Sequence, residues 1–183
     1  MHTHALHKGY TLIELLVTLS LVTSLLAWAV PSLSDVIHSV RVHTGTQALT
    51  SSLALARSEA VKRNTRVVMC KSAHGLACEP GASWEQGWIV FHDPNNNGVV
   101  DAGEHVLHRE AAMPPALRMS GNTPVNHYVS YTPYGRTKQL SGAFQAGTFT
   151  VCTTSGKRVQ ARQVVINSVG RARVANASLT QCA

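Results

Sequence analysis

Acidic residues are scarce in this 183-residue chain and absent from its C-terminal part. The sequence has 9 Asp and Glu against 16 Lys and Arg, a formal net charge of +7, and it has no Asp or Glu from Ala111 to Ala183. Positive charge without neighbouring carboxylates attracts anionic partners. The last third of the chain is therefore the first place to look for a binding surface.

The sequence also lacks the motifs of common catalytic and metal sites. No Cys-x-x-Cys pair occurs, so a zinc ribbon or a thioredoxin-like redox site has no support. The ten histidines are scattered, without a Ser-His-Asp arrangement, a His-Glu-x-x-His pattern or a Gly-rich phosphate loop. We therefore expect no enzymatic activity and no cofactor.

One long apolar run is present, and it contains a carboxylate. The segment from Tyr10 to Val30 is mostly apolar. As a helix with about 1.5 Å rise per residue it would span roughly 30 Å, the hydrocarbon thickness of a bilayer. Glu14 lies near its start, where a charge in lipid is costly and is expected to have a partner.

A short polar leader precedes this run. Residues 1–8 end at Lys8, and Gly9 is a small residue at the junction. Cleavage after Gly9 would leave the whole apolar helix on the mature protein, unlike cleavage of a secretory signal peptide. The single Lys8 favours a cytoplasmic leader, with everything beyond Val30 across the membrane.

This order of features resembles the class III signal of type IV pilins and pseudopilins. The resemblance implies that a prepilin peptidase cuts after Gly9 and methylates Tyr10, a position where phenylalanine is commoner. It also implies that Glu14 pairs with a free terminal amine when other pilins join the filament. The protein would be a single-pass inner-membrane protein with a periplasmic head before assembly and a pilus subunit afterwards. An uncleaved signal anchor is the alternative.

Four cysteines are candidates for two disulfides in an oxidising periplasm. Three pairings are open from the sequence. Cys70 with Cys78 closes a short loop, and Cys152 with Cys182 would tie down the C-terminal tail. We favour the pairing of Cys70 with Cys78 and of Cys152 with Cys182.

After Val30 the pattern predicts a second helical stretch, residues 31–63, with Pro31 marking a kink or a restart. Polar residues that include Arg57 and Lys62 are predicted to form its solvated face. Its other face is an apolar stripe at three-to-four-residue spacing: Leu33, Val36, Ile37, Val40, Thr44, Ala48, Leu53, Ala56 and Ala60.

The rest of the chain predicts one β-rich head. Six strands separated by turn residues are expected at 66–70, 87–91, 105–108, 127–131, 148–152 and 163–166. A helix followed by strands indicates an α+β fold, with mainly antiparallel sheet packed on the C-terminal half of the helix. The expected segments are a leader (1–9), a transmembrane and filament-core helix (10–30), its amphipathic continuation (31–63) and the head (64–183).

Four internal blocks of sequence narrow the resemblance from pilin-like proteins in general to one group of them. They are Leu55–Asn64, Trp84–Phe91, Asp93–Glu104 and Tyr131–Arg136. These blocks resemble the GspH/FimT group, which contains minor pseudopilins of the type II secretion system and minor pilins of type IV pili. The resemblance implies a type IV pilin-like fold with two β-sheets against the helix.

The block 93–104 also fits the loop of an EF-hand. Oxygen ligands would come from the first, third, fifth, ninth and twelfth places, which are Asp93, Asn95, Asn97, Asp101 and Glu104. The flanks, however, are strand-like, and Pro-Asn-Asn-Asn-Gly is a strong turn sequence. The group it resembles carries this block as a connection between strands. We therefore favour a hairpin turn over a calcium site.

Basic residues gather in the acid-free part of the chain. Arg171 and Arg173 are two apart, so in a strand they would project from one face and engage successive phosphates. The other basic candidates are Arg136, Lys138, Lys157, Arg158 and Arg162.

The tetrapeptide Gly170-Arg171-Ala172-Arg173 matches a Gly-Arg-x-Arg signature of FimT-like minor pilins that serve DNA uptake. The resemblance implies phosphate-directed binding of double-stranded DNA without sequence preference. An ordinary solvated strand face is the alternative for these residues.

The sequence therefore favours a FimT-type minor pilin that captures extracellular DNA for uptake in natural transformation. A GspH-like pseudopilin of the type II secretion system is one rival, and a minor pilin that primes assembly without touching DNA is another. The acid-free region favours the DNA receptor, because a secretion subunit has no need of it.

Overall fold

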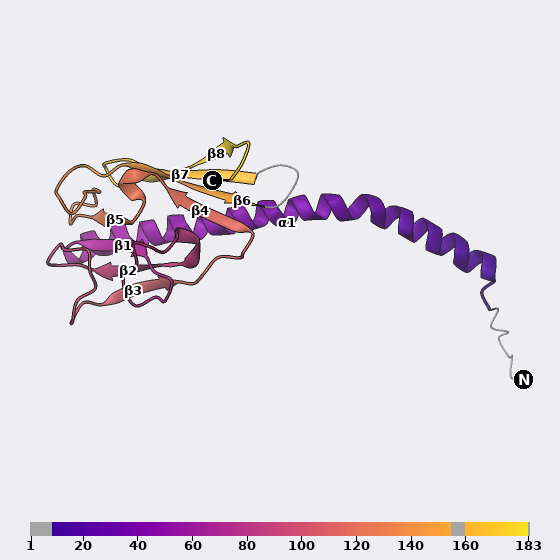
Figure 1. Cartoon of the computed structure of the whole chain (residues 1–183), viewed down its shortest axis with the longest axis horizontal. Helices are drawn as coiled ribbons and strands as arrows, with labels where there is room; N and C mark the ends of the chain where they lie inside the picture. Colours follow the sequence, from indigo (N-terminus) through magenta and orange to yellow (C-terminus); the bar gives the residue numbers. More distant parts are fainter. Residues whose placement is uncertain (1–8, 155–159, 183) are drawn as a thin grey trace, which may run out of the picture. The chain divides into compact units, whose positions relative to one another are not determined.

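The computed structural model describes residues 9–154 and 160–182. In these residues one helix, α1 (Leu12–Arg63), precedes eight strands (Figure 1). The chain divides into two compact units, Met1–Ile37 and His38–Ala183, and α1 contributes to both. All strands belong to the second unit, which we call the head.

The strands of the head form two antiparallel four-stranded sheets. The first has the order β3-β2-β1-β5 and the second the order β4-β6-β7-β8. Two 3₁₀ turns, η1 (Trp84–Gln86) and η2 (Thr123–Val125), lie between strands. The strands are β1 (Val67–Lys71), β2 (Trp88–His92), β3 (Val106–Glu110), β4 (Leu117–Gly121), β5 (Tyr128–Tyr131), β6 (Gly147–Thr153), β7 (Gln160–Ile166) and β8 (Ala172–Ser178).

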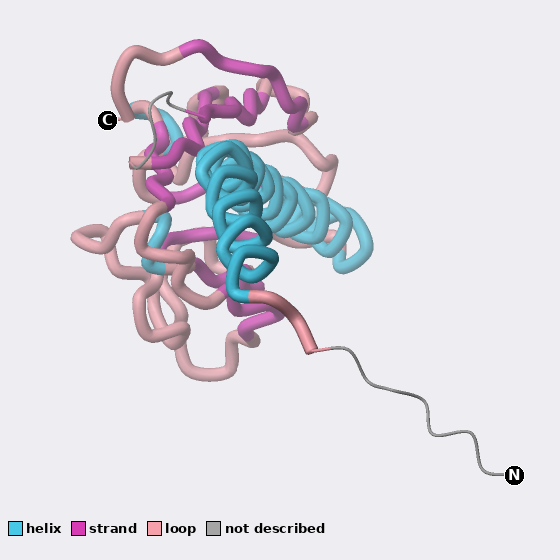
Figure 2. The backbone as a smooth tube through the Cα atoms, turned by 90° about the vertical axis from the view of Figure 1, so that its right-hand side faces the viewer, coloured by secondary structure: helices cyan, strands magenta, loops and turns pink. Residues whose placement is uncertain are grey.

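The two sheets enclose the C-terminal part of α1. Figures 1 and 2, which differ by a quarter turn, both show strands on either side of this part of the helix. Trp84 and Phe149 meet edge to face in the same core, with ring centroids 5.1 Å apart. One buried cluster joins the three layers, with Leu49, Leu53 and Ala56 from α1, Met69 and Val90 from the first sheet, and Phe149 and Val151 from the second.

A second buried cluster covers the other face of the first sheet. β1 is buried at all five positions because β2 and β5 flank it and both of its faces are covered. Val68 and Phe91 pack there with Cys78 and Val100, which come from loops. All members of both clusters lie within the head, so we expect residues 38–183 to fold by themselves.

Both disulfides that the sequence favoured are present. Cys70–Cys78 joins β1 to the loop that follows it. Cys152–Cys182 joins β6 to the residues after β8. The second bond therefore fixes the end of the chain to the middle of the second sheet.

A buried glutamine joins the edge of the first sheet to neighbouring loops. The Gln145 side-chain oxygen accepts a hydrogen bond from the Ser130 backbone N–H at 2.9 Å. Its amide group donates to the carbonyls of Pro124 and Tyr128, at 2.8 Å each. Gln145 is fully buried, so this one side chain satisfies backbone groups that would otherwise lack partners.

The α+β prediction is confirmed, with two antiparallel sheets packed on the helix. The six predicted strands correspond to β1, β2, β3, β5, β6 and β7. The prediction missed β4 and β8. β4 contains only two large apolar residues, Leu117 and Met119, and lies between turn residues, and β8 consists mostly of small or polar residues that remain exposed or half-buried.

The predicted helix stripe is only partly correct. Leu53, Ala56 and Ala60 are buried, as predicted, but Leu33 and Val36 are more than half exposed. The difference arises because the buried face of α1 begins at Val42. The helix also continues through Pro31 without the predicted restart. A proline removes one helical hydrogen bond, and the turns on both sides supply the others.

No helix in the described part of the chain is long and apolar enough to cross a membrane. The transmembrane anchor predicted for residues 10–30 therefore stays a prediction.

We predict that Gln145→Leu destabilises the head by about 3 kcal/mol, because one N–H and two carbonyls lose their buried partner. Urea unfolding of residues 38–183 measures the change. Gln47→Leu, at an exposed position of α1, is the matched control and should stay within about 0.5 kcal/mol of the parent. Equal unfolding midpoints for the two variants would refute the role given to Gln145.

Candidate functional site

Two turns of the head meet at a pair of glycines. One turn follows β5 and closes with a hydrogen bond from Gly135 N–H to the Thr132 carbonyl; the other joins β7 to β8 and closes from Gly170 N–H to the Asn167 carbonyl, at 2.8 Å each. Gly135 and Gly170 have φ angles of 69° and 80°, which favour glycine. A Cβ atom on Gly170 would collide with the Gly135 carbonyl oxygen. The turns are therefore in direct contact.

Arg57 of α1 holds this contact in place. Its Nε donates a 3.0 Å hydrogen bond to the Gly135 carbonyl, across 78 positions of sequence. A Cβ on Gly135 would lie 3.0 Å from Arg57 Nε and 3.3 Å from Val61 Cγ2. We call the meeting point of Arg57, Gly135 and Gly170 the glycine junction.

A groove of about 750 Å³ lies beside the glycine junction. We call it the α1–β8 groove because α1 forms one side and the start of β8 the other. Its lining is mostly apolar. The residues are Thr50, Leu53, Ala54, Arg57, Ser58, Val61, Lys62, Tyr131, Gly170, Arg171 and Ala172.

Three cations line the groove, and two of them are uncompensated. Lys62 Nζ lies 3.5 Å from a Glu59 carboxylate oxygen. Hydrogen bonding from Arg63 and the charge of Lys62 lower the pKa of Glu59, so this carboxylate stays ionised. Arg57 and Arg171 have no carboxylate within ion-pair distance among the residues that the structure describes. The excess charge of the groove therefore comes from these two arginines.

Tyr131 adds a buried polar group to the groove. Its side chain is 0% exposed, and burial raises the pKa of its hydroxyl group. The hydroxyl therefore keeps its proton. Residues 9–154 and 160–182 provide no hydrogen-bond partner for it. It is a donor without an acceptor at the wall of the groove.

Of the basic residues singled out in the sequence, three lie near the glycine junction. Arg136 follows Gly135 and is exposed. Arg171 lines the groove. Arg173 is exposed on β8, opposite Val165 of β7. Arg136 and Arg171 therefore come from the two turns that touch, and Arg173 comes from the strand that follows one of them.

Two other predicted basic residues lie elsewhere in the head. Arg162 Nη1 contacts His43 Nδ1 of α1 at 3.0 Å. β7 ends at Ile166, four residues after Arg162, so Arg162 lies roughly 13 Å along the strand from the turn that follows β7. Lys138 donates its backbone N–H to the Ser130 carbonyl, beside the first sheet. Lys157 and Arg158 lie outside the described residues. The basic candidates therefore do not all share one surface.

Sequence reasoning missed Arg57 and Lys62, which it assigned to the solvated face of the helix. Both line the groove, and Arg57 is half-buried. Helical periodicity cannot report a contact made 78 positions away. The available signal was the block Leu55–Asn64, which contains both residues.

The segment 93–104 connects the antiparallel strands β2 and β3, as predicted for a hairpin connection, and the preference for a turn over a calcium site stays a prediction. Asp93 accepts hydrogen bonds from the N–H groups of Asn97 and Gly98, at 3.1 Å each. The side-chain amides of Asn95 and Asn97 donate to Asp101 and lower its pKa. No cluster of three or more His, Cys, Asp or Glu side chains suited to a metal ion occurs in the described residues.

The predicted processing site lies at the start of α1. Gly9 and Tyr10 precede the helix, and Tyr10 is 86% exposed. Glu14 lies in the first turn, where a carboxylate is favoured by the helix dipole, and its N–H donates to Thr11 Oγ1 at 3.3 Å. Large apolar side chains around it are also exposed, including Leu12 at 78%. Such a surface marks a site of interaction.

Comparison with known proteins agrees with this architecture. Residues 45–170 match the family described as type II transport protein GspH, and residues 5–30 match the prokaryotic N-terminal methylation motif. Pilin-like protein PilA1 of Thermus thermophilus is 29% identical over 175 residues, which cover 91% of this chain and 97% of PilA1.

The fold is similar to that of the type IV minor pilin FimU of Pseudomonas aeruginosa. One crystal form has a TM-score of 0.57 at 18% identity and covers 78% of this chain and 95% of FimU. A second form has a TM-score of 0.55, also at 18% identity, and covers 77% of this chain and 99% of FimU. At this identity the likeness concerns the fold.

We predict that Gly170→Ala destabilises the head by about 2 kcal/mol more than Gly142→Ala does, because only the first adds a backbone collision. Gly142 has a φ angle of 88°, but a Cβ atom there would meet nothing within 4 Å. The pair therefore separates the collision from the cost of a positive φ angle. Urea unfolding of residues 38–183 gives both values, and equal losses would contradict the close contact at the glycine junction.

Proposed function

The chain belongs to the GspH family of pilin-like proteins, and from this premise we propose that it is a FimT-like minor pilin that binds double-stranded DNA for uptake in natural transformation. The observation that carries the proposal is the set of arginines at the glycine junction. Arg136 and Arg171 directly follow the two glycines that are in contact, and Arg173 lies two residues beyond Arg171, in a stretch of chain without carboxylates.

These arginines suit phosphate contacts without base readout. Guanidinium groups bind phosphate oxygens, which carry no sequence information. In the described part of the head, α1 is the single helix and its buried face packs between the two sheets, so no separate helix is available to enter a major groove. Binding of this kind depends on charge and weakens as the salt concentration rises.

The N-terminal part of α1 suits assembly with other pilins. Its exposed apolar side chains need cover, which neighbouring helices of a filament supply. Cleavage after Gly9 by prepilin peptidase would free the amine of Tyr10, the partner proposed for Glu14. Before assembly this part would lie at the inner membrane, with the head in the periplasm, where both disulfides form.

The match of residues 45–170 to the GspH family favours one second candidate, a minor pseudopilin of the type II secretion system. Such a subunit would contact other pseudopilins or secreted proteins through its head. This second candidate function gives no role to the positive charges of Arg57 and Arg171, which no carboxylate of the described residues neutralises.

We predict that Arg171→Ala with Arg173→Ala weakens the binding of double-stranded DNA to residues 38–183. Loss of two phosphate contacts should reduce the slope of log affinity against log salt concentration by about 2. Fluorescence anisotropy with a labelled duplex, from low to moderate salt, measures both quantities.

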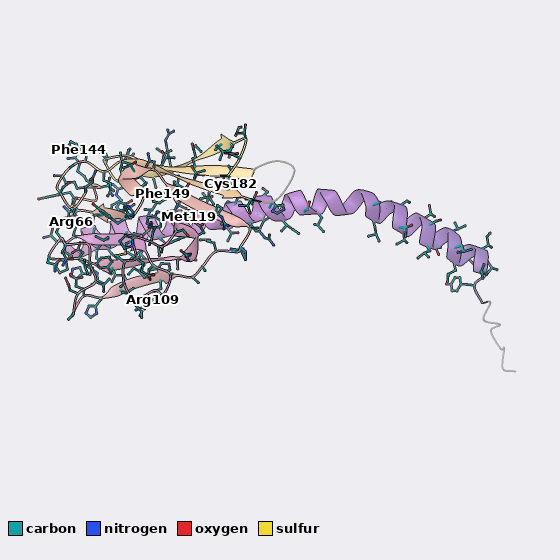
Figure 3. All side chains as sticks on the ribbon, in the orientation of Figure 1. Arg66, Arg109, Met119, Phe144, Phe149 and Cys182 are labelled. Carbon is teal, nitrogen blue, oxygen red and sulfur yellow. A yellow bond between two sulfur atoms is a disulfide. The ribbon has the colours of Figure 1, made fainter. Side chains whose placement is uncertain are left out.

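The control removes the same charge from the strands β3 and β4, with Arg109→Ala and Arg118→Ala. Arg109 lies in the first sheet, away from β8 (Figure 3). The control should keep the parental salt slope. Absence of duplex binding at low salt, or equal slopes for the two double variants, would exclude the proposed site.

We predict that the mature protein begins at Tyr10 with a methylated amine. Mass spectrometry of the protein from a host with prepilin peptidase should show loss of residues 1–9 and the addition of one methyl group. A Gly9→Leu variant should retain the leader, because the peptidase requires a small residue there. Retention of the leader by the parent protein would contradict the processing assignment.

A further inference from the structure

The α1–β8 groove differs in kind from a surface that binds duplex DNA. A duplex offers phosphates on the outside of a stiff helix, and exposed side chains suffice to contact them. The groove instead is recessed and has accessible apolar walls, including Ala54 and Val61. Its volume of about 750 Å³ lies in the range of small-molecule sites. It suits a ligand that buries apolar surface.

Three residues of the groove, Arg57, Tyr131 and Arg171, keep side-chain donors without a protein acceptor in the described part of the chain. Its other polar residues have partners: Thr50 and Ser58 donate to carbonyls of α1, and Lys62 pairs with Glu59. Arg57 has five N–H groups, and its one hydrogen bond within the described residues goes from Nε to the Gly135 carbonyl. The Tyr131 side chain is largely buried, and its hydroxyl, at the wall of the groove, also has no acceptor there. Arg171 adds a third donor group. A ligand for this site must carry acceptors and negative charge as well as an apolar face.

We propose that the α1–β8 groove binds an unpaired nucleotide of DNA. A base has apolar faces that pack on Ala54 and Val61, which are exposed in the groove, and its edge carries acceptors for the Tyr131 hydroxyl. Its phosphate supplies the anionic partner that Arg57 and Arg171 lack. All four bases meet these requirements, so the site needs no particular sequence.

This inference rests on the proposed DNA binding and deepens it. The preferred ligand becomes DNA with unpaired nucleotides, either single strands or frayed duplex ends. A base within a closed duplex is stacked and paired, so it reaches the groove only after unstacking. The arginines at the glycine junction still hold the neighbouring phosphates.

An exposed aromatic residue beside the glycine junction supports the same ligand. Tyr134 precedes Gly135 and is 86% exposed. Proteins that bind single strands without sequence preference combine cations with aromatic side chains on which bases stack. Tyr134 supplies the aromatic surface and Arg136 and Arg171 supply the cations.

An acidic peptide is the main competing ligand. It would satisfy the arginines, but a chain of carboxylates has little apolar surface to bury against Ala54 and Val61. The walls of the groove therefore favour the nucleotide.

The test uses residues 38–183 and two labelled DNAs of equal length and composition: a single strand, and a duplex whose two ends are closed by covalent linkers that contain no nucleotide. We expect the single strand to bind roughly tenfold more tightly, the effect of stacking about one base. Ala54→Trp fills the groove from an exposed position on α1. It should bring the single strand down to the affinity of the closed duplex and leave the duplex unchanged.

Two further variants separate the contribution of the Tyr131 hydroxyl from the effect of added bulk on α1. Tyr131→Phe removes the hydroxyl alone and should weaken single-strand binding about threefold, with an unchanged unfolding midpoint. Gln47→Trp adds the same bulk at an exposed position of α1 outside the groove and should leave binding of both DNAs unchanged.

The outcomes separate the two hypotheses. If neither DNA binds, the proposed function itself fails. If the closed duplex binds as tightly as the single strand, or Ala54→Trp leaves single-strand affinity unchanged, the groove proposal fails while DNA binding stands. If poly-glutamate displaces the single strand as well as an unlabelled strand of equal charge does, the groove takes acidic chains, and the proposal is overturned.

Discussion

The contact between Gly170 and Gly135, held by Arg57, is the constraint on which the candidate site depends. It joins three elements that are far apart in the sequence: the helix, the turn after β5 and the turn between β7 and β8. A side chain on Gly170 would collide with the carbonyl that Arg57 binds. The glycine of the Gly-Arg-x-Arg tetrapeptide therefore has a steric role, and the arginine beside it lines the groove because the turns lie so close.

The same contact compensates for a weakness of β8. None of its residues is buried, and it lies at the edge of its sheet, so packing alone holds it poorly. Three other restraints act on it. The register with β7 covers all seven residues, the glycine junction fixes its start, and Cys152–Cys182 fixes the chain beyond its end. A strand rich in small and exposed residues can thus carry charged groups at a defined position.

Much of the fold was predictable from the sequence, because apolar periodicity reports burial locally. The strands β1, β2 and β6 contain Val, Ile and Phe between turn residues and were predicted to within a few residues. β8 was missed because few of its residues are apolar, and its partner β7 alone defines it. Arg57 was assigned to solvent for a related reason: its partner Gly135 is distant in sequence, and only the folded chain shows that this cation is half-buried.

Fold and ligand depend on different residues in this protein. The head resembles FimU at 18% identity, so different side chains support the same two sheets and helix. The family match therefore establishes the architecture and says little about what the head binds. The ligand is indicated instead by groups that the fold leaves unsatisfied. Arg57, Arg171 and the Tyr131 hydroxyl are donors without acceptors on an apolar groove. These donors are open to solvent in the groove, and an anionic ligand with an apolar face replaces their hydration with charge-assisted hydrogen bonds while it buries apolar surface.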